Sequence, residues 1–376
     1  MNVRTELDKY VEKIESKYNV DCISAFVTGS RLYGTDTPES DYDIKGVFIS
    51  SKKQYLGFLD AINILGQNNE DDHLDFEFME LTKFLTLCLN NNPNIVEYLF
   101  IPDNRMLFQS YEWKQILENK EYFLSKKAKH TFTGYAISQI KRLKRHRSWL
   151  LTPPKKKPER NDYDLPETHK LITSDQIGAY NQLVCNYLRQ VGKFHNLRTE
   201  LEEMEETIDY MSVLTQVDRL DSTAVCEIYP TDINFMVALE KEKNYNQAMK
   251  EFKSYHSWKK QRNPRRKKLE TNFGFDTKHM MHCFRLLSEG KELLETGHIT
   301  FPRPDRELLK EISEGVYKYD ELIEKVEDIE QQFNQFYIDS PLPKQPNRNK
   351  IDQVCIDILS KSVKENKNDK CNYKRE

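Results

Sequence analysis

Strand-like patterns are confined to roughly the first 105 residues, and this division constrains the fold more than any other feature. Residues 22–29, CISAFVTG, form an apolar run that ends at a glycine, and residues 41–50, DYDIKGVFIS, repeat the pattern. Residues 61–65 are a candidate third strand, and 73–81, HLDFEFMEL, alternate polar and apolar residues as a fourth. Everything later has helical periodicity and no convincing strand. The sequence therefore predicts an α+β chain, with a small mixed sheet followed by a mostly helical region.

The helical part divides into segments of ordinary length. Residues 2–18 show helical spacing ahead of the first strand, and the segment 81–100 predicts two short helices broken at Asn92-Pro93. Later helices are expected at 131–150, 175–206, 232–260, 276–296, 304–313, 319–337 and 347–363. The predicted domains are a sheet domain at 1–105 and a helical domain at 106–363, with a linker at about 152–166 and a disordered tail at 364–376.

Composition narrows the class of protein. Only 12 of the 376 residues are glycine, which argues against a large α/β barrel or a turn-rich β-sandwich. The seven cysteines form no C-x-x-C pair, which predicts reduced thiols in the cytoplasm and neither a disulfide framework nor a zinc site. No apolar run approaches the roughly 18 residues of a membrane span, so no membrane partner is expected.

Positive charge is concentrated in two stretches, although the net charge is only −3. Residues 120–160 carry thirteen Lys and Arg against two acids, and residues 258–268 carry seven against none. Such a distribution is typical of a chain that binds a polyanion locally. The candidate nucleic-acid contacts are Lys141, Arg145, Arg262, Arg265 and Arg266. A charged helix surface and a solvated loop, in which Pro264 fixes a turn, are the alternatives; Tyr255 and Trp258 nearby could add stacking.

Two aspartates one residue apart begin the second predicted strand. Side chains two apart on a strand share a face, so Asp41 and Asp43 should lie side by side. Paired carboxylates raise each other's pKa unless a cation lies between them. Because Mg²⁺ is held by one or two carboxylates together with substrate phosphates, the pair predicts a site for Mg²⁺ or Mn²⁺.

A Gly-Ser turn precedes the aspartate pair by ten residues. Gly29 would let the backbone approach a ligand closely, and Ser30 offers a hydroxyl and an N–H at an expected helix start, which suits a phosphate. A surface turn beside a surface acid pair is the alternative.

The spacing G-S-x10-D-x-D resembles the DNA polymerase β-like nucleotidyltransferase superfamily. The resemblance implies a third carboxylate on a later strand, and L-D-F at 74–76 assigns this role to Asp75, with Glu77 as the fallback. It also implies an NTP substrate, with Gly29, Ser30 and Arg31 among its binding residues.

Further motifs resemble the branch of that superfamily that is linked to RNA repair, whose genes are often associated with RNA ligases. Residues 29–48, residues 91–100 (NNPNIVEYLF) and residues 258–305, from WKKQRNPRRKK to FPRPD, carry its pattern. The resemblance runs from about 23 to 325, apart from a middle region that does not align, and Phe275 stands where the family usually has tyrosine.

The segment 276–287 carries a second candidate group. Lys278, His282 and Arg285 fall on one stripe of a helix, opposite apolar residues. Alone, this spacing predicts a solvated basic face. With the family resemblance it implies a helix that closes over the active site and offers charge to the nucleotide phosphates.

Together these features predict a pyrophosphate-releasing nucleotidyltransferase that uses Asp41, Asp43 and Asp75 as catalytic and metal-binding residues. It would transfer a nucleoside monophosphate from an NTP to an acceptor hydroxyl. The basic segments and the family's link to RNA repair favour an RNA end, tRNA-like, as the acceptor. Nucleotidylation of a protein or small molecule is the alternative among enzymes, and a catalytically silent nucleotide- or RNA-binding module is the alternative outside them.

Overall fold

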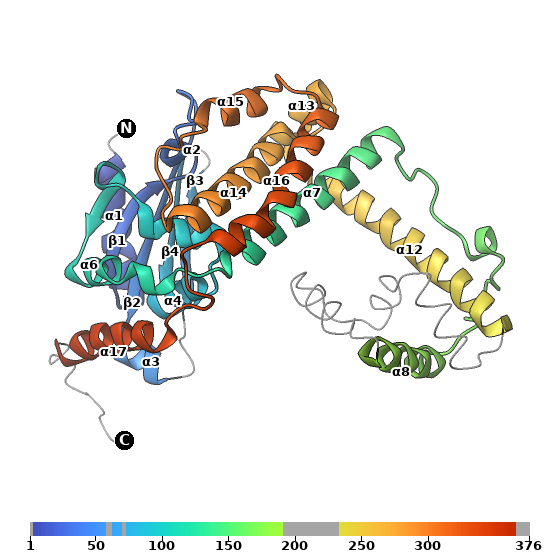
Figure 1. The fold of residues 1–376 in the computed structure, drawn as a ribbon, viewed down its shortest axis with the longest axis horizontal. Coiled ribbons are helices and arrows are strands. Elements are labelled where there is room, and N and C mark those ends of the chain that lie inside the picture. Colours follow the sequence, from blue (N-terminus) through green and yellow to red (C-terminus); the bar gives the residue numbers. More distant parts are fainter. Residues whose placement is uncertain (1–2, 58–61, 70–72, 191–232, 366–376) are drawn as a thin grey trace. The chain divides into compact units, whose positions relative to one another are not determined.

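The computed structural model describes residues 3–57, 62–69, 73–190 and 233–365 (Figure 1). The chain forms two compact units. Unit 1 combines Met1–Ile140 with Thr277–Glu376, and unit 2 is Lys141–Asp276. Unit 1 therefore joins two separate stretches of sequence, and the predicted division near residue 105 stays a prediction. Among the described residues, no helix is long and apolar enough to cross a membrane.

Unit 1 contains a five-stranded mixed sheet, which confirms the predicted α+β architecture. In spatial order its strands are β3 (Ile64–Asn69), β4 (Leu74–Glu80), β2 (Tyr42–Ser50), β1 (Val20–Thr28) and β5 (Met106–Gln109). Strand β2 pairs in parallel with β4, whereas the other neighbouring pairs are antiparallel. The parallel register places Asp43 directly beside Asp75.

Two strands differ from the prediction. Strand β5 lies beyond residue 105, where no strand was expected, because four residues are too few to show alternation and their ladder partner, β1, is far away in sequence. Strand β3 begins at Ile64, so it shares only two residues with the predicted strand at 61–65.

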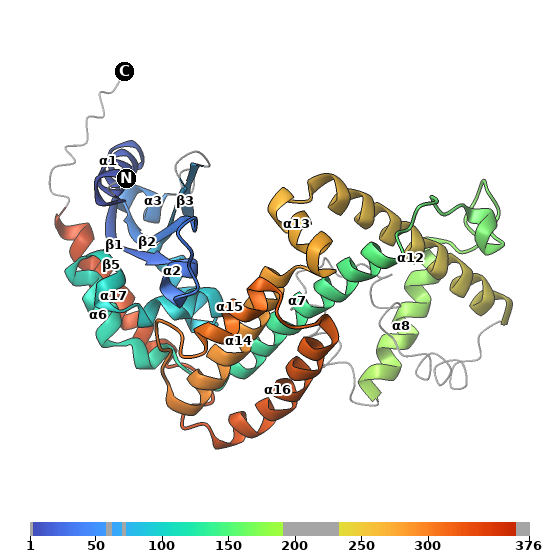
Figure 2. The ribbon, with the colours of Figure 1, turned by 90° about the horizontal axis from the view of Figure 1, so that it is seen from above.

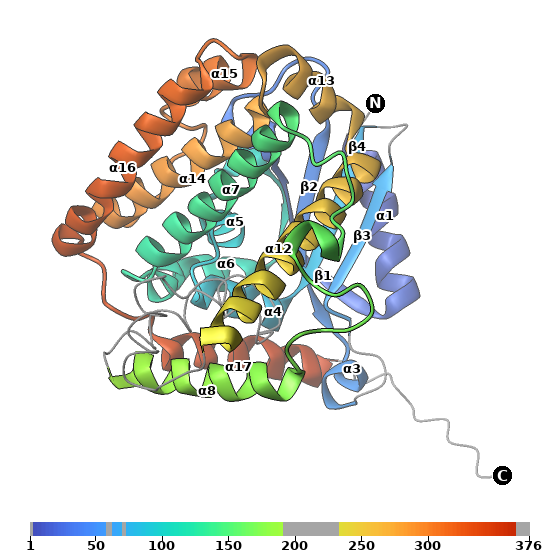
Figure 3. The ribbon, with the colours of Figure 1, turned by 90° about the vertical axis from the view of Figure 1, so that its right-hand side faces the viewer.

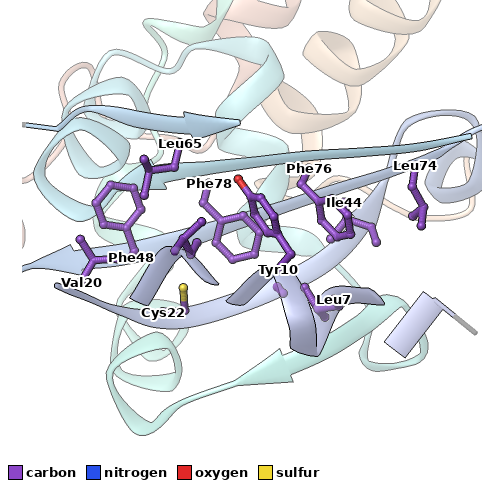
Figure 4. Close-up of a cluster of buried hydrophobic side chains, with 12 residues drawn as sticks. Leu7, Tyr10, Val20, Cys22, Ile44, Phe48, Leu65, Leu74, Phe76 and Phe78 are labelled. Carbon is purple, nitrogen blue, oxygen red and sulfur yellow. The ribbon is translucent and has the colours of Figure 1, made fainter. Parts of the chain in front are cut away.

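Apolar side chains at alternate positions of the strands form one face of the sheet. This face packs against α1 (Val3–Tyr18), as Figures 3 and 4 show. Leu7 and Tyr10 of α1 pack there with Ile44 and Phe78, and the ring of Tyr10 stacks on that of Phe76 with 4.5 Å between centroids. Since successive side chains point to opposite faces, the residues between these apolar positions face away from α1.

Helices account for most of the remaining described chain. Unit 1 contains α2 (Gly29–Tyr33), α3 (Lys52–Leu56), α4 (Leu81–Leu89), α5 (Pro93–Val96), α6 (Tyr111–Glu118), α14 (Thr277–Thr296), α15 (Arg306–Glu314), α16 (Tyr319–Asp339) and α17 (Arg348–Glu365). Helix α14 packs against α15 and α16 (Figure 2). Helix α7 (Ala128–Leu151) begins in unit 1 and continues into unit 2, which also contains α8 (Ser174–Gln190), α12 (Ile233–Gln261) and α13 (Pro264–Phe273).

The predicted helices are found, with two qualifications. The helix expected at 175–206 is present to Gln190, and the rest of it, like the predicted tail, lies outside the described residues. The turn expected at Pro264 is wrong, because Pro264 is the first residue of α13. A proline is tolerated there because its missing N–H would have no helical partner, and the Asn263 side chain caps the helix by accepting from the N–H of Arg265.

Candidate nucleotide and metal site

Carboxylates from neighbouring strands gather on the face of the sheet away from α1. Asp43 of β2 lies beside Asp75 of β4, Glu77 follows two residues later on β4, and Asp41 immediately precedes β2. Burial raises the pKa of the Asp43 carboxyl, and the ammonium of Lys45 opposes that shift. The charges of the other three carboxylates raise it further, so all four interact.

The cations of the site do not neutralise this group. Within the described residues, neither Asp43 nor Asp75 forms an ion pair, whereas Glu77 Oε2 lies 3.6 Å from Lys45 Nζ. All four carboxylates are at least partly exposed, so solvent and ligands can reach them. The arrangement therefore leaves Asp43 and Asp75 without an ion-pair partner in the described chain, although the charge of Lys45 still acts on Asp43.

Gly29 contacts Asp43 so closely that a side chain at position 29 would collide with the Asp43 carboxylate unless the Asp43 side chain moved. Strand β1 ends at Thr28, whose hydroxyl donates to the backbone carbonyl of Asp43 at 3.1 Å. A Cβ on Gly29 would lie only 2.0 Å from Asp43 Oδ2, and the Gly29 φ of +66° is itself unfavourable for a residue with a side chain. The structure thus brings the Gly-Ser turn and the aspartate pair into contact.

Arg31 stabilises the loop that connects this turn to β2. Its Nη2 donates to the carbonyl of Ser40 at 2.6 Å, its Nη1 lies 3.3 Å from Asp36 Oδ2, and its guanidinium stacks 3.8 Å from the ring centroid of Tyr42. Arg31 therefore positions the loop, and its predicted contact with nucleotide stays a prediction. Ser30 lies at the start of α2, next to Gly29.

Sequence reasoning overlooked His73. Its Nδ1 lies 2.5 Å from Asp41 Oδ1, and its carbonyl accepts the backbone N–H of Tyr42 at 2.8 Å. The signal was present in H-L-D, because His73 precedes Asp75 by two residues, just as Asp41 precedes Asp43. The two strand starts therefore place a histidine opposite the first aspartate.

The donor set fits a hard divalent cation in its chemistry. Carboxylate oxygens are the ligands that Mg²⁺ prefers, and a cation would relieve the repulsion that raises the pKa of Asp43. Within the described ranges, however, no three His, Cys, Asp or Glu side chains are already assembled so that they could hold a metal ion. Because Asp41 pairs with His73, binding would require at least that side chain to reorient.

The predicted basic stripe of α14 contains both exposed and buried residues. Lys278 is exposed and His282 is half-buried, but only 3% of Arg285 is exposed. The expectation of a solvated basic face is wrong at Arg285, because α14 is covered by other helices on more than one side. Helical spacing predicts which side chains share one side of a helix. It does not predict which neighbouring elements cover that side.

Arg285 is neutralised by acids from two helical segments. Its Nη1 lies 2.8 Å from Glu97 Oε2 and 2.8 Å from Glu289 Oε2, and its Nη2 donates to Asn94 Oδ1 at 3.2 Å. Burial raises the pKa of Glu97 to about 8, and the charge of Arg285 opposes the shift. Burial also raises the pKa of Glu289. Two buried carboxylates thus share one guanidinium, which leaves no evident charge for a phosphate.

This buried network reaches the Gly-Ser turn through Tyr33, which lies at the end of α2. The Tyr33 hydroxyl donates to Glu97 Oε1 at 3.0 Å, and the guanidinium of Arg285 lies 4.3 Å from the Tyr33 ring centroid. The Tyr33 carbonyl accepts the N–H of Arg303 at 3.0 Å. Three motifs that are distant in sequence therefore meet at α2, and together they anchor its far end.

The comparisons with known proteins agree with the motifs. Residues 3–156 match the family model RlaP, described as the RNA repair pathway DNA polymerase beta family. These residues, fewer than half of the chain, are similar to that family of polymerase β-like nucleotidyltransferases, in agreement with the resemblance seen in the sequence.

Two curated relatives are similar to the chain. An uncharacterized 38.9 kDa protein from the nrdC-mobD intergenic region of Enterobacteria phage T4 is 22% identical over 318 residues, which cover 80% of this chain and 85% of that protein. The uncharacterized protein YcgL of Bacillus subtilis (strain 168) is 30% identical over 89 residues, or 24% and 34% of the two chains. A crystal structure of a nucleotidyltransferase-like protein from Exiguobacterium sibiricum covers 69% of this chain and 81% of its own, but at 8% identity and a TM-score of 0.22 it carries no argument.

Proposed function

We propose that this chain is a metal-dependent nucleotidyltransferase that moves a nucleoside monophosphate from an NTP to a hydroxyl at an RNA end. The observation that carries the proposal is the contact of Asp43 with Gly29 on one side and its register with Asp75 on the other. Neither acid forms an ion pair within the described residues, so the site favours an incoming cation with its phosphates. The match of residues 3–156 to the RNA-repair family supports the reaction class.

Each residue of the site has a proposed role. Asp41, Asp43 and Asp75 would hold Mg²⁺ or Mn²⁺, with Glu77 as the fallback ligand. The bound ion would supply Lewis-acid stabilisation of the charge that develops on the phosphate. The hydroxyl of Ser30 and the backbone after Gly29 would orient the terminal phosphates, and Asp75 would accept the proton of the attacking hydroxyl. Lys278, exposed at the start of α14, remains a candidate contact to phosphate. Arg285 is left out because its charge is already paired.

The experiment that tests this function follows the label from NTP to acceptor. The full chain is incubated with Mg²⁺ and each α-labelled NTP, either with RNA or with a protein extract. Label in RNA supports the proposal, and label in protein supports nucleotidylation of protein instead. No label in either acceptor would overturn the assignment as an enzyme.

Two variants make the result specific to the site. Asp43→Asn should abolish the transfer of label, because it removes the central carboxylate. Asp8→Asn, which removes an equal charge from an exposed position on α1, should transfer label like the wild-type chain. Equal label from Asp43→Asn and Asp8→Asn would place the chemistry elsewhere.

A further inference from the structure

The two basic stretches of the sequence meet inside unit 2, where the later part of α7 contacts the later part of α12 (Figure 1). The ring of Trp258 lies 5.1 Å from that of His146 and 5.4 Å from that of Trp149. Tyr255 adds a further ring, 5.9 Å from Trp149. Aromatic packing therefore fixes the two basic helices against each other.

Two of the acids near this contact are paired with arginines, whereas Glu251 accepts from the Trp149 indole N–H at 3.3 Å. Glu270 pairs with Arg262, and Asp276 Oδ1 lies 2.8 Å from Arg266 Nη1. Both arginines hold α13 against its surroundings, so we assign them a structural role and omit them from the RNA contacts that follow. This pairing removes two acids that would otherwise oppose a polyanion.

A larger set of basic side chains remains exposed. Neither 141–151 nor 252–269 contains an acid. The exposed cations on α7, α12 and α13, which together we name the basic surface, are Lys141, Arg142, Lys144, Arg145, Lys253, Lys259, Lys260, Arg265, Lys267 and Lys268. The positive charges on these parts of the three helices repel one another, and a bound polyanion would relieve this repulsion.

We propose that the basic surface binds the phosphate backbone of the RNA whose end receives the nucleotide. This inference rests on the proposed function and adds a docking surface outside the catalytic unit. Binding is largely independent of base sequence, because Trp149 and Tyr255 are only 3% and 8% exposed, and the half-buried Trp258 packs against Trp149 and lies 4.6 Å from the Arg262 guanidinium. The expected stacking of bases on Tyr255 is therefore not part of the proposal, and charge supplies the affinity.

The test measures the binding of fluorescein-labelled bulk tRNA to the full chain by fluorescence anisotropy at several salt concentrations. Two charge reversals probe separate helices: Lys267→Glu/Lys268→Glu on α13 and Lys141→Glu/Arg145→Glu on α7. Each should raise the Kd at least about tenfold and reduce the slope of log K against log salt by about 0.7 to 0.9 for every phosphate that the variant no longer binds. The control Lys114→Glu/Lys325→Glu changes the net charge equally at exposed positions of unit 1 and should bind like wild type.

The outcomes separate this inference from the proposed function. Thermal melts test whether each variant is folded. Because two independent variants are used, the test still applies if one of them does not fold. Wild-type affinity in both reversals, or no tRNA binding by the wild-type chain, overturns the inference even where nucleotide transfer is observed. Weakened binding in both reversals supports it even if the transfer experiment fails.

Discussion

Unit 1 contains two groups of carboxylates that differ in burial and in ion pairing. Glu97 and Glu289 are buried, and Arg285 lies 2.8 Å from an oxygen of each. Asp43 and Asp75 lie side by side on the sheet, partly exposed, and form no ion pair within the described residues. The first group has its cation built into the fold, whereas we propose that the second binds one from outside.

We interpret the first group as residues that stabilise the fold and the second as residues that bind a ligand. Both groups come from segments that resemble family motifs, so motif membership alone did not distinguish them. The two are also connected, because Tyr33 bonds to Glu97 at one end of α2 while Gly29 contacts Asp43 at the other. We infer that the buried group positions the turn that the exposed group uses.

The largest effect is expected from removing the buried cation. Arg285→Met leaves two carboxylates buried without the cation that they share, so the free energy of unfolding should fall by about 3 to 5 kcal/mol. Lys278→Met removes the same charge from an exposed position of the same helix and should change it by less than about 0.5 kcal/mol. Urea unfolding of both variants makes the comparison; similar losses would mean that burial does not distinguish these two cations.

The next effect concerns activity and leaves stability intact. Asp43→Asn should lower the rate of nucleotide transfer at least about 100-fold, since it removes a carboxylate that would hold the divalent cation at the reacting phosphates. Its Tm should stay equal or rise, because the substitution also removes repulsion from three neighbouring carboxylates. A large drop in Tm would show that Asp43 supports the fold and would contradict its role as a ligand.

A smaller effect is expected at the contact between turn and sheet. Gly29→Ala places a Cβ 2.0 Å from Asp43 Oδ2 at a positive φ, so we expect a loss of about 1 to 3 kcal/mol together with reduced transfer. Gly178→Ala in α8 meets nothing within 4 Å and should be neutral or slightly stabilising. Thermal melts and the transfer assay test both, and a Gly29→Ala chain with wild-type activity would remove the turn from the site.

The last effect is a dependence of stability on pH, spread over several pH units. Glu97 has a raised pKa of about 8, so the folded chain binds more protons than the unfolded chain between the ordinary carboxyl pKa and that value. The free energy of unfolding should therefore fall as pH rises from about 5 to 8, by at most about 1.4 kcal/mol per pH unit for this group. Glu97→Gln should flatten this slope in urea unfolding at several pH values, and an unchanged slope would contradict the raised pKa.

The sheet face of the site was predictable because its information is local. Alternation along D-Y-D predicted that Asp41 and Asp43 share a face, and the family resemblance supplied Asp75, which the structure places beside Asp43 in register. The same reasoning would have found His73 if the residue two places before Asp75 had been considered. Strand β5 was missed because a four-residue strand has no period to detect.

The buried network was not predictable from a single helix. Tyr33, Glu97 and Arg285 come from three distant segments, and nothing in the pattern of any one of them indicates that their polar ends meet. The helical spacing correctly placed Lys278, His282 and Arg285 on one side of α14. At Arg285, however, that side contacts Glu97 and Glu289 and not solvent. Burial of a charge depends on its partners, which the helix itself does not encode.

The central claim is that the sheet carboxylates bind a divalent cation together with a nucleotide. Isothermal titration of Mn²⁺ and a non-hydrolysable NTP analogue into the wild-type chain and into Asp43→Asn tests this claim most directly. We predict that the wild-type chain binds the analogue only when Mn²⁺ is present, and that Asp43→Asn loses this metal-dependent binding. Equal binding by both proteins, or binding that does not depend on Mn²⁺, would contradict the assignment.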